Sequence, residues 1–117
     1  MSTLMTDLHT RSDVGADLAS MEVWTAWVSK LMAQAAEQAA NPQTQRTLTG
    51  AAEDAAALRD AFASATAGWL DDGQITVLRS IYGLWADNLE RFEQMAATVA
   101  PELHRMWRSR SASARPA

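Results

Sequence analysis

One apolar stripe runs the length of residues 73–107 and most constrains what this chain folds into. Its members recur at alternating intervals of three and four residues: Ile75, Leu78, Tyr82, Trp85, Leu89, Phe92, Ala96 and Val99. This spacing is that of an amphipathic helix, and its persistence over more than three heptads favours helices packed lengthwise at a shallow angle. The pattern predicts a long helix over residues 74–98 and, after the interruption at Pro101, a short helix over residues 101–108.

The same spacing occurs in two earlier segments. Ser12 or Asp13 is a suitable N-cap for a first helix, which Pro42 ends. Asn41 is then the predicted N-cap of a second helix with Pro42 in its first turn. The apolar positions of the first helix are Val14, Leu18, Met21, Trp24, Val28, Leu31 or Met32, Ala35 and Ala39. Those of the second helix are Leu48, Ala51, Ala55, Leu58, Phe62, Ala65 and Trp69.

Short connections join these helices, so neighbours in sequence are predicted to be antiparallel neighbours in space. Asp71 or Asp72, in the turn "DDG", is the expected cap of the third helix. The predicted fold is an all-α antiparallel bundle of three long helices with a short C-terminal helix. Its domain covers residues 13–108, between disordered tails at residues 1–12 and 109–117.

Charge and composition narrow the functional classes. The 117 residues include no cysteine, so the sequence has neither a disulfide nor a thiolate metal site, and we expect a cytoplasmic protein. No stretch approaches 18 consecutive apolar residues, and no membrane-spanning segment is predicted. Residues 1–100 hold 13 acids and 6 bases, whereas residues 101–117 hold four arginines and one glutamate. The acidic body argues against a nucleic-acid partner.

Catalytic and metal-binding patterns are missing from the sequence. His9 falls in the predicted N-terminal tail, and His104 is interpreted as a solvated surface residue. Glu90 and Glu93 share a helix face, but no Glu-x-x-His motif accompanies them. There is no glycine-rich phosphate loop or nucleophile elbow. We therefore predict no catalytic, cofactor or metal residue and no enzymatic activity.

Apolar residues outside the main stripes raise the question of a partner. They include Val23, Trp27, Val77, Ile81 and Leu84, and the chain has five tryptophans, a residue enriched at contact surfaces. Either all apolar faces close on one another within one bundle, or a second chain completes part of the surface. The candidate partner-binding residues are Trp27, Ile81, Leu84, Arg105, Trp107 and Arg108. The leading interpretation is a helical accessory subunit that self-associates or binds a protein partner.

Two stretches, "AANPQTQRTLTGAAEDAAALRDAF" and "VLRSIYGLWADNLERFEQMA", support an alternative. In their alanine-rich amphipathic helices and the Tyr82-x-x-Trp85 phrase, they resemble phasins and the non-catalytic accessory subunits of polyhydroxyalkanoate synthases. The resemblance implies helix faces that lie on a polymer granule or cover part of a synthase. It implies no site residue. A further alternative is a small-ligand carrier with a tryptophan-lined pocket between helices.

Overall fold

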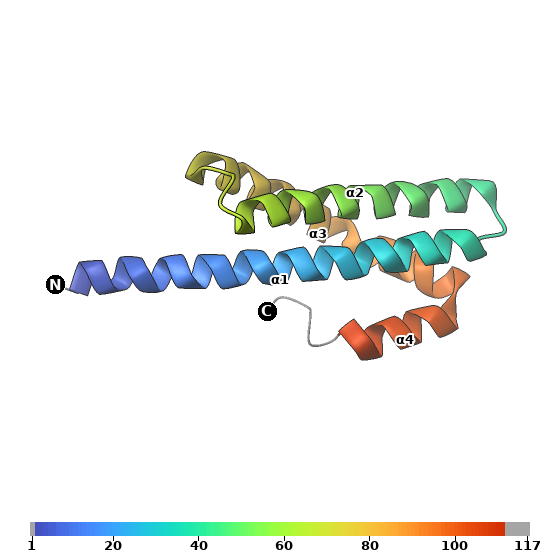
Figure 1. Ribbon diagram of the computed structural model, residues 1–117. Helices are drawn as coiled ribbons and strands as arrows, with labels where there is room; N and C mark the ends of the chain where they lie inside the picture. The colour runs from blue at the N-terminus through green and yellow to red at the C-terminus, as the bar shows by residue number, and fades with distance from the viewer. Residues whose placement is uncertain (1, 112–117) are drawn as a thin grey trace.

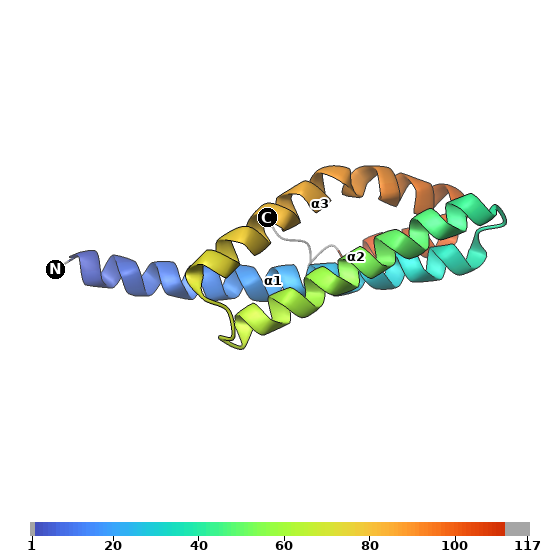
Figure 2. The ribbon, with the colours of Figure 1, turned by 90° about the horizontal axis from the view of Figure 1, so that it is seen from above.

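The computed structural model describes residues 2–111, with side chains from Asp17 onward. Four helices make up this part of the chain: α1 (Ser2–Gln38), α2 (Pro42–Thr66), α3 (Asp72–Val99) and α4 (Pro101–Ser111). Figures 1 and 2 show α1 and α2 side by side along most of α2, with α3 across them and α4 folded back along α1. The predicted all-α bundle of three long helices and a short fourth one is confirmed.

Two helix bounds differ from those that the sequence predicts. α1 begins at Ser2, not near Ser12 or Asp13, because no glycine or proline precedes Gly15 and adding residues to an existing helix costs little. This first part of α1 projects beyond the other helices (Figure 1). α4 continues to Ser111, three residues into the predicted C-terminal tail, whose remaining residues 112–117 lie outside the described part of the chain.

The caps of α2 and α3 are those that the sequence predicts. The Asn41 side chain accepts hydrogen bonds from the backbone N–H groups of Gln43 and Thr44, and Pro42 opens the helix. Before α3, Asp71 accepts from the backbone of Gln74, while the Gln74 side chain accepts from the backbone N–H of Asp71. This reciprocal pair is a capping box, which fixes where the third helix starts.

The end of α2 differs from the prediction for Trp69. The helix ends at Thr66, and Gly68 adopts a φ of 84°, a left-handed conformation that glycine tolerates best. The N–H of Gly68 then bonds to the oxygen of Ala65, and that of Trp69 to the oxygen of Ser64, as in a Schellman motif. This turn takes Trp69 out of the apolar stripe and leaves it 81% exposed.

The contact between α1 and α2 is the most extensive in the fold, and small residues make it close. The buried α2 residues are Leu48, Ala51, Ala52, Ala55, Leu58, Phe62 and Ala65. They pack against an α1 face that buries Leu18, Trp24, Val28, Leu31, Met32, Ala35 and Ala36. The hydroxyl of Ser29 donates directly to the backbone oxygen of Ala52 at 3.0 Å, which requires the two helix backbones to lie near one another.

The apolar stripe of α3 faces the interior of the bundle. Leu78, Leu89 and Ala96 are buried, and the other five members are partly buried against the two core clusters. Near the start of α3, Arg79 pairs with Asp17 of α1 at 2.5 Å. The stripe therefore closes the chain's own core, but α3 buries far less of its length than α2 does.

α4 folds back antiparallel to α1 on the side away from α2 (Figure 1). Within the described residues it contacts α1 and α3 but not α2. Trp107 enters the core cluster built around Trp24 and Leu31. Across residues 2–111, no helix combines the length and apolar character needed to cross a membrane.

Candidate functional site

The outer surface of α3 carries a row of exposed apolar side chains, which we call the outer ridge: Val77, Ile81 and Leu84. Their exposed fractions are 59%, 49% and 69%. They recur at intervals of four and three residues, so they lie along one face of the helix. The apolar stripe of α3 that faces the core, which we call the inner stripe, has the same spacing. The outer ridge repeats it on a side of α3 that no other helix covers within the described part of the chain.

A shallow apolar groove of about 630 Å³ lies beside the outer ridge, between α2 and α3. Ala57 and Ala61 of α2 form one wall, and Ile81 and Leu84 of α3 form the other. The floor includes Leu58 and Leu78, which are buried. Its polar lining residues are Asp54, Asn88 and Arg91.

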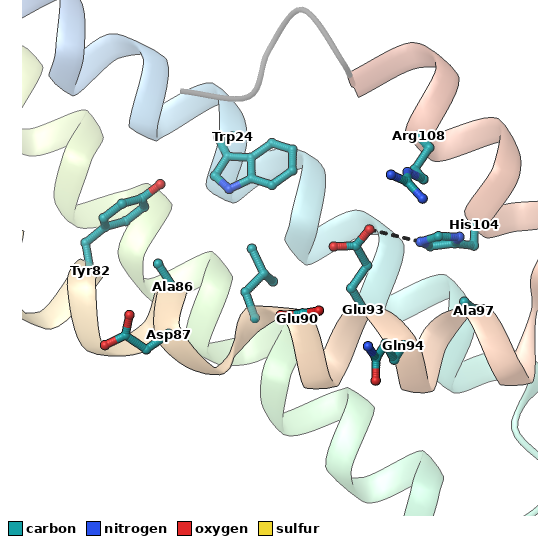
Figure 3. Close-up of a pocket in the computed structure, with 11 residues that line it drawn as sticks. Trp24, Tyr82, Ala86, Asp87, Glu90, Glu93, Gln94, Ala97, His104 and Arg108 are labelled. Atoms are coloured by element: carbon teal, nitrogen blue, oxygen red, sulfur yellow. Dashed lines mark hydrogen bonds and ion pairs between the residues drawn. The ribbon is translucent and has the colours of Figure 1, made fainter. Parts of the chain in front are cut away.

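A second groove, the polar groove, lies between α1, α3 and α4 and has a volume of about 660 Å³ (Figure 3). Its acidic residues are Asp87, Glu90 and Glu93, all on α3. Arg108 projects into it from α4, and Trp24 stands at the α1 side (Figure 3). Acidic side chains of α3 thus face basic side chains of α4.

His104 lies inside this polar groove and is not the solvated residue that the sequence suggested. Its Nε2 lies 3.1 Å from Oε1 of Glu93, and the two side chains are 15% and 16% exposed. The imidazole also stacks on Trp107, with ring centroids 5.9 Å apart. The residue therefore helps to hold α4 against α3.

The predicted partner-binding residues fall into separate places. Ile81 and Leu84 are together on the outer ridge. Arg105 is exposed on α4 beside Glu102, and Arg108 lines the polar groove. Trp27 is half-buried, and its backbone oxygen accepts a hydrogen bond from Trp107.

Trp107 departs furthest from the prediction, since only 6% of it is exposed. It packs 5.3 Å from Trp24, ring centroid to ring centroid, and so belongs to the chain's own core. Sequence reasoning also missed the exposure of Trp69 and the pairing of His104 with Glu93. The eleven-residue separation of that pair gave no signal, because it spans the break at Pro101.

Among residues 17–111, no group of three or more histidines and carboxylates is arranged to hold a metal ion. Comparison with known proteins gives no match: no family model, no curated protein and no solved structure is significantly similar to this chain.

Proposed function

We propose that this chain is a non-enzymatic helical interaction module that associates through its apolar helix faces, first with a second copy of itself. The observation that carries the proposal is the outer ridge, Val77, Ile81 and Leu84, exposed beside an apolar groove. Isolated apolar residues are ordinary on a protein surface, but a continuous row beside a groove is typical of a contact surface.

The spacing of the ridge suits a partner that is itself a helix. Intervals of four and three residues allow side chains of one helix to enter the spaces of another. Two copies of the same ridge, related by a twofold axis, satisfy this requirement with a single self-complementary surface. Ala57 and Ala61 on the facing wall are small, so an incoming helix meets no bulky side chain there.

Charge-introducing variants test this proposal. Leu84→Glu and Ile81→Glu each place a carboxylate at the centre of the ridge, where an apolar contact would have to desolvate it. Both residues are already exposed, so we expect unchanged helicity and unfolding midpoint in dilute solution but loss of the association that the ridge makes. Thr98→Glu is the matched control, since it adds the same charge at an exposed α3 position that lines neither the apolar groove nor the polar groove. Association as strong in both ridge variants as in the natural chain would refute the proposal.

A second candidate function is favoured by the exposure of Trp69 and by the small number of buried residues on α3. Trp69 is 81% exposed at the end of the bundle where α2 turns into α3. We propose as the alternative a phasin-like, surface-active protein that coats a polymer granule or a membrane, since an amphipathic helix binds such a surface through its apolar face. The test is binding to apolar polymer particles: the alternative requires binding with retained helicity, weakened by Trp69→Ser. No enrichment on the particles would exclude it.

A further inference from the structure

The short helix α4 is held by few contacts, and among the described residues these contacts are with α1 and α3. Trp107 donates from Nε1 to the oxygen of Trp27 at 3.2 Å and packs on the ring of Trp24. His104 pairs with Glu93. Of the eleven residues of α4, only Trp107 and Ser111 are buried. α4 is therefore an arm with one large aromatic anchor and a largely exposed outer surface.

A single residue connects this arm to the rest of the chain. Ala100 has φ −139° and ψ 71°, outside the helical region, and stands between Val99, the last residue of α3, and Pro101, the first of α4. A residue before proline disfavours helical geometry, so α3 and α4 remain separate elements whatever the angle between them. Rotation at this one connection moves the whole arm without unfolding either helix.

The surface under the arm fits the arm in both shape and charge. Its aromatic part is formed by Trp24 and Trp27, against which Trp107 packs. Its acidic part is the α3 face with Asp87, Glu90 and Glu93. The arm itself carries Arg105, Arg108 and Arg110 against one acid, Glu102. An arm of identical sequence from another molecule meets the same complementary surface.

We propose that α4 is exchanged between two copies of this chain, so that the arm of each copy lies on α1 and α3 of the other. In such an exchange every contact of the closed arm is remade between molecules, and only the conformation around Ala100 changes. Exchange of identical elements between copies is a low-cost route to dimers, and it requires a change only at the connection, here Ala100. This interface is distinct from the outer ridge of the proposed function, because it uses α4 and the surface of α1 and α3 beneath it, whereas the outer ridge consists of Val77, Ile81 and Leu84.

Engineered cysteines test the exchange directly, since the natural chain contains none. Lys30 of α1 and Arg110 of α4 are exposed and line the same shallow depression between the two helices. The full-length variants Lys30→Cys and Arg110→Cys are purified separately, mixed at high concentration and treated with a short bismaleimide. We expect a covalent heterodimer whose linked peptides contain positions 30 and 110. Glu53→Cys mixed with Arg110→Cys is the control. Glu53 is on α2, which α4 does not contact within the described residues, so we expect no link between these positions.

The outcomes separate this inference from the proposed function. A link between positions 30 and 110 of different molecules, retained when Leu84→Glu is added, supports exchange even if the outer ridge plays no part. If the amount of this link does not exceed that in the Glu53 control, exchange is overturned. Self-association that then depends on Leu84 would come from the outer ridge alone. A second measurement uses Trp107→Ala and Trp107→Phe, which weaken the arm's anchor. The anchor must detach before an arm can exchange, so exchange requires the link between positions 30 and 110 to form faster after mixing in chains that carry either substitution, and an unchanged rate of linking contradicts it.

Discussion

The indole of Trp107 donates a hydrogen bond to the main-chain oxygen of Trp27, which lies eighty residues earlier in the chain. That oxygen belongs to α1, and a carbonyl oxygen has a second lone pair to offer beyond its helical bond. The same indole ring lies 5.3 Å from that of Trp24. One side chain thus joins the C-terminal helix to the first helix by both a polar and an aromatic contact.

Replacing this side chain separates the two contributions. Trp107→Ala removes the ring and leaves a cavity, for which we expect a loss of about 3–5 kcal/mol in the free energy of unfolding. Trp107→Phe keeps an aromatic ring and loses the hydrogen bond, worth about 0.5–1.5 kcal/mol. Urea denaturation of both variants measures the difference. An alanine variant no less stable than the phenylalanine variant would contradict the placement of Trp107 in the core.

The close contact of α1 and α2 predicts a sharp difference between two alanines of α2. Ala55 has no exposed surface, whereas Ala57 is exposed. Ala55→Leu forces extra atoms into a filled interface, at a cost of about 1–3 kcal/mol. Ala57→Leu leaves the free energy of unfolding within about 0.5 kcal/mol in dilute solution. Thermal or urea unfolding checks this, and equal effects at the two positions would show that the helices are not packed as described.

The N-cap of α2 gives a prediction about local stability. Asn41→Ala removes the oxygen that accepts from Gln43 and Thr44, which we expect to cost about 1 kcal/mol. Asn41→Asp keeps an acceptor in place and adds a negative charge where the helix dipole favours it, so it should retain the stability. Denaturation midpoints of the two variants decide the matter. A neutral alanine substitution would mean that the cap contributes nothing.

The pair formed by His104 and Glu93 predicts unequal effects at neighbouring positions of α4. His104→Ala removes a shielded hydrogen bond and a ring stacked on Trp107, and we expect a loss of about 1–2 kcal/mol. Arg105→Ala removes an exposed partner 3.8 Å from Glu102, which is worth less than about 1 kcal/mol. Hydrogen exchange localises the effect, since the His104 variant should speed exchange in α4 more than in α2. The reverse order of the two variants would contradict the assignment.

The sequence predicts the parts of this fold that depend on local chemistry. Asn41, Pro42 and Asp71 act within two or three residues of themselves, so their roles as caps can be read without a structure. The inner stripe of α3 is equally readable, because burial of one helix face imposes its spacing. The start of α1 was predicted too late because a helix needs no cap to continue, and Ser12 and Asp13 are only permitted starting points.

The candidate site was harder to predict, because it depends on how the helices lie against one another. Ile81 and Leu84 are apolar residues outside the stripe, a pattern that also suits a helix buried on two sides. Only the position of α3 at the edge of the bundle shows that they are exposed. The opposite error occurred at Trp107, where a tryptophan among arginines suggested a surface, and the return of α4 onto α1 buried it.

The native mass of the chain tests the central claim most directly. One chain weighs 12.7 kDa. Light scattering over a concentration series should give a mass of at least two chains for the natural sequence and a lower mass for Leu84→Glu under the same conditions. A mass of one chain at every concentration, for both proteins, would contradict the account of this molecule as a self-associating helical module.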